Sequence, residues 1–197
     1  MRIGVLALQG AFIEHIKILK RISVQTSEVR LKKDLEGLDG LIIPGGESTT
    51  IGKLAKMYDL IAPIMDFSKT NPVWGTCAGM ILMAKEIKGE QPILGIMDII
   101  VERNAFGRQV DSFEEKLYID KLIDSKIKPF PAIFIRAPKL INAGNNAQII
   151  ARLADGTAVA AIQNKLLATA FHPELSDDDR FHRFFINLVK IRHPELV

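Results

Sequence analysis

The stretch Pro72-Val73-Trp74-Gly75-Thr76-Cys77-Ala78-Gly79-Met80-Ile81-Leu82-Met83-Ala84 decides the fold of this chain. A short apolar run leads into a Gly-x-Cys-x-Gly pattern, and apolar residues at helical spacing follow at once. This order predicts a strand, a tight turn and a helix, which is the form of a nucleophile elbow with cysteine in the nucleophile position. Such a turn needs small residues on both sides, and Gly75 and Gly79 supply them.

Cys77 is the sole cysteine, which excludes a disulfide within the chain and a cysteine-cluster zinc site. A free cysteine is more often a small buried hydrophobe than a reactive group. The elbow reverses that preference, because the turn pushes the sulfur out at the carboxyl end of the sheet. It also points a helix N-terminus at the sulfur, which favours the thiolate. We therefore interpret Cys77 as a nucleophile.

The composition is that of an ordinary globular protein. The 197 residues are 48% hydrophobic and 25% charged, with a formal net charge of +3, and we expect one domain spanning 1–197. Lysines and arginines are scattered among acidic residues, so a nucleic-acid partner is not expected. The apolar run at the N-terminus is too short for a signal peptide and no later segment could span a membrane, which predicts a cytoplasmic protein.

Alternation of strands and helices predicts the fold class. Continuously apolar runs at Ile3–Leu8 and Gly40–Ile43 are typical of buried parallel strands. Helices are predicted over residues 12–21, over 177–191, after the elbow through Ala84, and through Met57 from a cap at Ser48 or Thr49. A short strand is predicted near Val29 and a short helix near Asp34. Short strand-like pieces divided by turn residues follow the elbow helix, at Ile93–Val101, Leu117–Ile119, Ala132–Ile135, Gln148–Leu153, Val159–Ile162 and Leu166–Ala170. We predict a three-layer α/β fold with a mostly parallel, flavodoxin-like central sheet flanked by helices and an antiparallel extension.

A cysteine nucleophile needs a base, and the base needs an orienting group. His15 follows Glu14 in the first predicted helix, which favours a place on the surface or behind the site, and His182 lies inside the last helix. The other two histidines each begin a His-Pro-Glu-Leu sequence, at His172 and His193. His172 follows a strand and so lies at a carboxyl end, as Cys77 does, whereas the second copy is near the terminus. We predict His172 as base and Glu174 as its orienting partner.

An oxyanion that forms during acyl transfer needs N–H donors. The amide of Ala78, directly after the nucleophile, is one, and the Gly45-Gly46 loop after the neighbouring strand is placed to supply another through Gly46. A phosphate-loop interpretation of residues 46–53 fails, because the glycine spacing is one residue too long and Leu54 stands where Ser or Thr is required. No G-x-G-x-x-G follows a strand. We expect no cofactor and no metal.

The chain resembles the class I, triad-type glutamine amidotransferases, which hydrolyse glutamine through a glutamyl thioester and pass on ammonia. Within that class it is similar to the glutaminase subunits of pyridoxal 5′-phosphate synthases. The matching segments cover almost the full length: residues 4–11 with Glu14-His15, Pro44–Thr50, Gly75–Gly79, Arg103–Phe113, Phe134–Pro138 and Phe171–Leu175.

The resemblance implies that Cys77, His172 and Glu174 form the triad. It implies a glutamine site lined by Gly46, Glu47, Ser48, Arg103, Ile135 and Arg136. The arginines suit the α-carboxylate, and Glu47 with carbonyl groups suits the α-ammonium. The family also places Gln9 near the oxyanion loop and the contact with a partner.

The expected partner is a separate synthase subunit, because ammonia is useful only where an acceptor waits and no second substrate domain fits within this length. In the family, that subunit is a (β/α)₈ barrel that makes pyridoxal 5′-phosphate, and many such glutaminases are nearly silent until the partner orders the oxyanion hole. A Gly-Gly loop that can flip its peptide would permit this.

Two other functions compete with the glutaminase hypothesis. A Cys-His peptidase or deglycase-like hydrolase would keep Cys77 without needing Arg103 and Arg136 around a free amino acid. A non-catalytic subunit could use the pocket to sense glutamine. The sequence does not give the stoichiometry of the complex, the oligomeric state of the free chain, the degree of activation, the ammonia route or the role of Ser23–Leu38.

Overall fold

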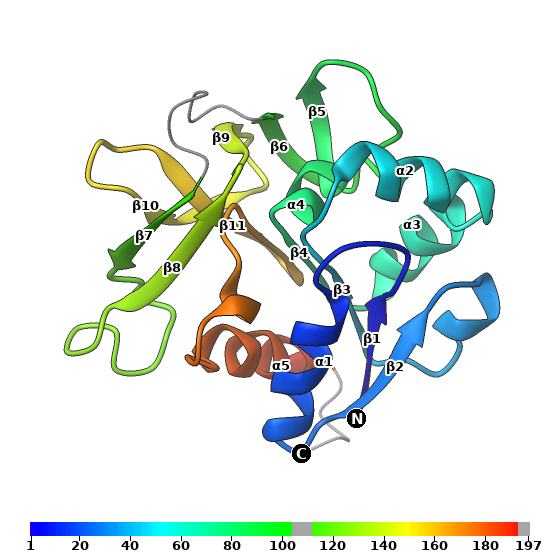
Figure 1. Cartoon of the computed structure of the whole chain (residues 1–197), viewed down its shortest axis with the longest axis horizontal. Helices are drawn as coiled ribbons and strands as arrows, with labels where there is room; N and C mark the ends of the chain where they lie inside the picture. Colours follow the sequence, from blue (N-terminus) through cyan, green and yellow to red (C-terminus); the bar gives the residue numbers. More distant parts are fainter. Residues whose placement is uncertain (104–111, 193–197) are drawn as a thin grey trace.

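A ten-stranded sheet runs through the middle of the molecule (Figure 1). The structure, a computed structural model, describes residues 1–103 and 112–192. Nine of its strands lie side by side in the order β2-β1-β3-β4-β12-β11-β9-β6-β5, and β10 pairs with β11. The strands β7 and β8 form a separate hairpin-like sheet.

The first half of the chain alternates strands and helices. Its elements are β1 (Arg2–Leu6), α1 (Phe12–Arg21), β2 (Gln25–Val29), the 3₁₀ helix η1 (Lys32–Leu35), β3 (Gly40–Ile43), α2 (Ser48–Met57), α3 (Ile61–Thr70), β4 (Val73–Thr76) and α4 (Ala78–Met83). The strands β1, β3 and β4 are buried almost throughout because parallel strands are covered on both faces. The predicted alternation is confirmed.

The second half is dominated by strands. Its elements are β5 (Ala84–Lys88), β6 (Met97–Glu102), β7 (Ser112–Leu117), β8 (Phe130–Ile135), β9 (Lys139–Ala143), β10 (Gln148–Arg152), β11 (Ala158–Gln163), β12 (Leu166–Thr169), the 3₁₀ helix η2 (Pro173–Leu175) and α5 (Arg180–Arg192). The pairs β12–β11, β11–β9, β9–β6 and β11–β10 are antiparallel. These pairs confirm the predicted antiparallel extension.

Five neighbouring strands, from β2 to β12, are mutually parallel. The last pair decides the site: Thr169 in β12 stands opposite Thr76 in β4, so both strands end at the same edge. The interpretation of Leu166–Ala170 as part of the antiparallel extension is therefore wrong on its β4 side, although β12 does pair antiparallel with β11. A two-residue hairpin joins β11 to β12, so β12 runs antiparallel to β11 on one side and parallel to β4 on the other.

Helices cover the sheet on two sides, with α1 and α5 together on one and α2 and α3 on the other (Figure 1). Trp74 in β4 is fully buried on the side of α1 and α5. Its ring meets those of His15 and His182 edge-on, with centroids 5.5 and 5.0 Å apart, and stacks on Phe181. The three-layer arrangement is thus confirmed, and polar rings lie within its core.

Several predicted boundaries differ from the structure. The elbow helix ends at Met83, and Ala84 begins β5, a strand that the sequence pattern did not predict; nor did it predict β9. The predicted strand over Ile93–Val101 begins only at Met97, and the strand predicted at 117–119 ends at Leu117. The last helix begins at Arg180 and not at 177. Short strands with charged residues carry a weak alternation, which explains most of these differences.

Two predicted features lie outside the described residues. Residues 104–111 contain most of the segment that begins at Arg103, and residues 193–197 contain the second His-Pro-Glu-Leu copy. Within residues 1–103 and 112–192, no helix combines the length and apolar character that crossing a membrane requires.

Candidate active site

Cys77 lies at the sharp turn between β4 and α4. Its backbone has φ 48° and ψ −102°, a strained conformation for a residue with a side chain, and its N–H donates to the carbonyl of Thr169 at 2.8 Å. A Cβ at Gly79 would collide with the carbonyl oxygen of Ile43, and one at Gly75 would collide with the backbone of Gly79. The predicted elbow is confirmed, and its two glycines are there because backbone approaches backbone.

His172 and Glu174 follow β12 at the same edge of the sheet. His172 Nδ1 lies 2.7 Å from Glu174 Oε1, and both side chains are almost completely buried. The backbone N–H of His172 donates to Ile133 in β8 at 2.8 Å, which anchors this turn. Residues 173–175 form a 3₁₀ helix begun by Pro173, so the two side chains meet across a tight turn and not along an extended segment.

His172 is held in its charged form between two partners. Burial alone would lower the pKa of His172, but hydrogen bonds with Cys77 and Glu174, together with their negative charges, raise that pKa to about 10. At neutral pH the ring is therefore an imidazolium that links Cys77 to Glu174. Cys77 Sγ also lies 3.8 Å from the carbonyl oxygen of Ile135.

A cavity of about 380 Å³ opens in front of Cys77 and His172. Besides these two, its lining contains every residue expected in the glutamine site: Gly46, Glu47, Ser48, Arg103, Ile135 and Arg136. Ile81, which was not predicted, also lines it and lies one helical turn after Cys77 in α4. Ala78, Glu174 and Gln9 are not among the described lining residues. The volume and the mixture of charges suit a small zwitterion.

The loop after β3 is held by the loop after β1. The carbonyl of Gly45 accepts from the N–H of Ala11 at 2.9 Å, and Gln9 Oε1 accepts from the N–H of Glu47 at 2.8 Å. In a trans peptide the N–H is opposite the carbonyl, so the Gly46 N–H points away from Ala11. A Cβ at Gly45 would collide with the His172 ring, so the bare backbone of this loop packs against the triad.

Glu47 fixes the start of α2, a role predicted for Ser48 or Thr49. Its carboxylate accepts from the N–H groups of Thr49 at 3.1 Å and Thr50 at 2.6 Å, so Glu47 is the N-cap. The hydroxyl of Thr50, helped by those N–H groups and opposed by partial burial, lowers the pKa of Glu47 to about 2. Arg103 Nη2 lies 3.4 Å from this carboxylate. The ionised Glu47 and Arg103 thus stand together at the cavity.

His15 lies behind the triad, which is the second of the two places that the sequence left open for it, and not on the surface. Its side chain is fully buried, with Nε2 3.3 Å from Glu174 Oε2 and Nδ1 3.0 Å from His182 Nε2. Phe12, His15, Ile16 and Leu19 follow the spacing of one helix face, so the sequence carried a signal that His15 points inward. The other expectation, that it lies behind the site, agrees with these distances.

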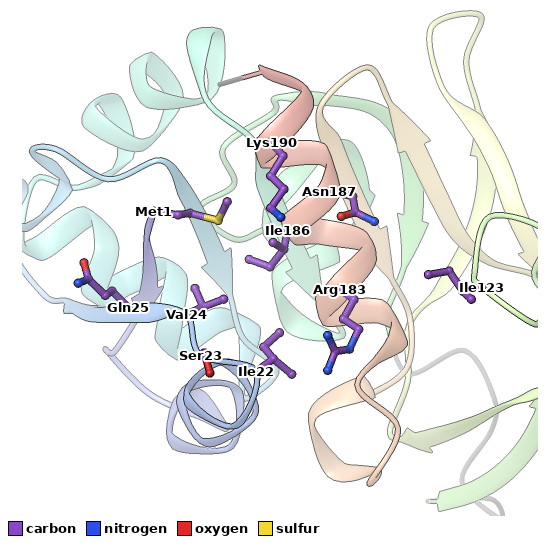
Figure 2. A pocket seen from close by; sticks show the side chains of 10 residues that line it. All are labelled: Met1, Ile22, Ser23, Val24, Gln25, Ile123, Arg183, Ile186, Asn187 and Lys190. Carbon is purple, nitrogen blue, oxygen red and sulfur yellow. The ribbon is translucent and has the colours of Figure 1, made fainter. Parts of the chain in front are cut away.

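A second cavity of about 520 Å³ lies at the opposite edge of the parallel strands. Met1 precedes β1 there, and Figure 2 shows Met1, Val24 and Ile186 around the space, with α5 along one side. Among its described lining residues are no members of the predicted site. It is larger than the cavity at Cys77, so size alone does not identify the active site. In the described part of the chain, no group of three or more His, Cys, Asp or Glu side chains is arranged to hold a metal ion.

Comparison with known protein families places this site in context. The sequence profile of the SNO glutamine amidotransferase family matches residues 5–191. The chain belongs to this family. A curated relative from Herpetosiphon aurantiacus is 56% identical over 193 residues, covering 95% of this chain and 100% of the relative. One from Dehalococcoides mccartyi is 53% identical over 198 residues, covering 98% and 100%. Both are named pyridoxal 5′-phosphate synthase subunit PdxT.

Solved structures agree with the membership of the SNO family. A crystal structure described as a glutamine amidotransferase superposes with a TM-score of 0.89, at 50% identity, over 95% of this chain and 98% of the other. The structure of PurLQS from Thermotoga maritima has a TM-score of 0.73 at 12% identity, covering 96% and 99%, and shows the shared fold alone. The predicted fold class and the resemblance stated from the sequence are both confirmed.

Proposed function

We propose that this chain hydrolyses L-glutamine to L-glutamate and ammonia through a Cys77 glutamyl thioester. The ammonia is delivered to a separate synthase subunit that makes pyridoxal 5′-phosphate, and residues 1–197 form one glutamine amidotransferase domain. One observation carries the proposal: the cavity that exposes Cys77 and His172 also contains Glu47, Arg103 and Arg136, the charged groups that a free amino acid requires. The names of relatives at 53–56% identity support it.

Acylation begins when the Cys77 thiolate attacks the side-chain amide carbon of glutamine. The amide oxygen gains negative charge, which the N–H groups of Ala78 and Gly46 stabilise in our proposal. The His172 imidazolium then gives its proton to the departing nitrogen, so that ammonia leaves and the thioester remains. Glu174, 2.7 Å from His172 Nδ1, keeps the ring oriented while its charge changes.

Deacylation uses the same groups in reverse. Neutral His172 takes a proton from water, and the resulting hydroxide attacks the thioester carbon. The carbon–sulfur bond breaks, glutamate leaves and the Cys77 thiolate is restored beside the imidazolium. The lack of a side chain at Gly45 leaves the His172 ring in this position, because a Cβ there would collide with it.

Arg103 and Arg136 bind the α-carboxylate of glutamine in this proposal, and Glu47 with neighbouring carbonyl groups binds the α-ammonium. Arg103 lies 3.4 Å from Glu47, so glutamine would insert its own two charges between groups that are already paired. A peptide bears no free charges at an internal residue. The charged lining therefore favours glutamine over the peptidase or deglycase-like alternative.

The partner in this proposal acts on the loop formed by Gly45 and Gly46. Contacts with Ala11 and Gln9 hold that loop in one conformation, and reorienting the Gly45–Gly46 peptide would break the 2.9 Å bond from Ala11. A synthase subunit that contacts the Gln9 loop could thus set the direction of the Gly46 N–H. We also place the reaction in the cytoplasm, where synthase and glutaminase would meet.

The decisive test is ammonia release from L-glutamine by the wild type and by Cys77→Ala, each alone and with the synthase subunit. We expect release that needs Cys77 and rises with the partner. Equal inactivity of both proteins in the complex would remove the glutaminase proposal, and glutamine binding without turnover would then support the sensor. Hydrolysis of peptides but not glutamine would support the other hydrolase. Full activity of the free chain, unchanged by the partner, would contradict the coupling.

A further inference from the structure

A line of buried polar side chains continues from the triad into the core, beyond the residues that the proposed mechanism uses. After His172 and Glu174 come His15 of α1 and His182 of α5. The joining distances are 2.7 Å from His172 Nδ1 to Glu174 Oε1, 3.3 Å from Glu174 Oε2 to His15 Nε2, and 3.0 Å from His15 Nδ1 to His182 Nε2. The side chains of His15, His182 and Glu174 are shielded from solvent.

Both distant histidines are neutral. Burial, followed by electrostatic interactions with the rings of His182 and His172, holds the pKa of His15 well below its ordinary value. Burial lowers the pKa of His182 to about 3, while Asp179 raises it and Arg21 lowers it by smaller amounts. A neutral imidazole has one N–H and one lone pair, so each ring donates at one nitrogen and accepts at the other.

The surroundings select one of the two tautomer patterns. In the described residues, Glu174 Oε2 and His182 Nδ1 make no hydrogen bond of ordinary geometry. If His15 carried its proton on Nδ1, its Nε2 lone pair would face the carboxylate and His182 would bury an unused N–H. If His15 carries it on Nε2, that N–H donates to Thr76 Oγ1 at 3.2 Å and lies 3.3 Å from Glu174 Oε2, and His182 Nε2–H donates to His15 Nδ1. The atoms without a hydrogen bond, His182 Nδ1 and Glu174 Oε2, are then both acceptors, and an unused acceptor costs less than a buried donor.

We propose that His15 is a positioning residue: its Nε2–H, 3.3 Å from Glu174 Oε2, attracts that carboxylate and keeps it where it holds the His172 ring toward Cys77, and His182 fixes the tautomer of His15. The inference rests on the glutaminase function proposed above. His15 reaches this place because α1 packs against η2, the turn that contains Glu174. The triad therefore has a polar contact behind it that no contact with substrate requires.

Paired substitutions separate positioning from packing. His15→Leu removes the donor and keeps an apolar side chain of similar reach, whereas His15→Gln keeps an N–H donor near the position of Nε2. With the synthase subunit present, we expect kcat of His15→Leu to fall about 10- to 100-fold, with KM for glutamine within about twofold. His15→Gln should recover to within about threefold of wild-type kcat. Ile18→Val, also a buried change in α1, should leave kcat unchanged.

Alkylation of Cys77 by iodoacetamide gives a readout that needs no glutamine, and the single cysteine makes it specific. Its rate should follow the same order, with wild type and His15→Gln above His15→Leu. If wild-type protein turns over no glutamine, the proposed function fails, and the alkylation order alone then decides the role of His15. If His15→Leu does not fold, His182→Leu and His182→Gln replace it, with a lower rate expected for Leu. Equal kcat and equal alkylation rates within such a pair would overturn the inference.

Discussion

Lowering the pH should destabilise this protein through His182, and the structure gives the size of the effect. The unfolded ring titrates near 6.5, whereas burial holds the pKa of the folded ring at about 3. Between these values the unfolded chain binds a proton that the folded chain refuses, so stability falls as the pH falls. One pKa unit corresponds to about 1.4 kcal/mol, and from pH 7 to pH 5 the loss works out at about 2 kcal/mol of unfolding free energy.

Other groups titrate over the same range, so the comparison must be with His182→Gln. His172, whose pKa is raised to about 10, changes in the opposite direction, because its stabilisation is complete below 6.5 and is lost as the pH rises through 10. The contribution of His172 to stability is shared by wild type and variant, so it cancels in the difference between their unfolding free energies. His182→Gln also keeps an N–H donor for His15.

Urea unfolding at pH 7, 6 and 5 provides the measurement, with fluorescence and circular dichroism as independent probes. The difference in unfolding free energy between wild type and His182→Gln should shift by about 2 kcal/mol toward the variant between pH 7 and pH 5. Parallel pH dependences of the two proteins would refute the reasoning, because they would mean that the folded chain accepts the proton on His182 as readily as the unfolded one does.

Gly79→Ala should lose about 3 kcal/mol or more of stability, because the new methyl group collides with the carbonyl of Ile43, and backbone cannot move aside as a side chain can. Thermal unfolding measures this loss, and an unchanged midpoint would contradict the contact. Arg103→Met should raise KM for glutamine about tenfold or more with a smaller effect on kcat, because it removes the proposed binding of the glutamine α-carboxylate in the ground state. Initial-rate kinetics in the complex with the synthase subunit test this. A loss confined to kcat would reject a role of Arg103 in binding the α-carboxylate.

The central features of the site could be predicted because they depend on short-range rules. A Gly-x-Cys-x-Gly turn after a buried strand leaves few conformations, and Cys77 adopts the strained one that the pattern indicates. A histidine after a second buried strand comes to the same edge when the strands are parallel, as the pairing of Thr76 with Thr169 makes them. The residues that the family resemblance implied for the glutamine site all line the cavity at Cys77.

The remaining features depend on distant contacts. The direction of β12 beside β4 depends on a strand that is distant in the sequence and leaves no mark on Leu166–Thr169 itself. Glu47 became the cap of α2 because a carboxylate reaches two N–H groups at once, whereas the prediction considered only hydroxyls. His15 was assigned by its charged neighbour Glu14 and not by its place on the apolar face of α1, and its partner Glu174 is 159 positions away in the chain.

The backbone hydrogen bond from the Cys77 N–H to the carbonyl of Thr169 has a wider consequence. This bond continues the hydrogen-bond pattern between β4 and β12 by one residue. The distance between the Cys77 sulfur and His172, which follows β12, is therefore set by the pairing of these two strands. The residues that we propose to bind substrate, by contrast, lie at or beyond the ends of β3, β6 and β8. The reacting groups are thus positioned by the paired strands of the sheet, whereas the proposed substrate-binding residues lie in segments at the strand ends. Substitutions in those segments could change the substrate without disturbing the reacting groups.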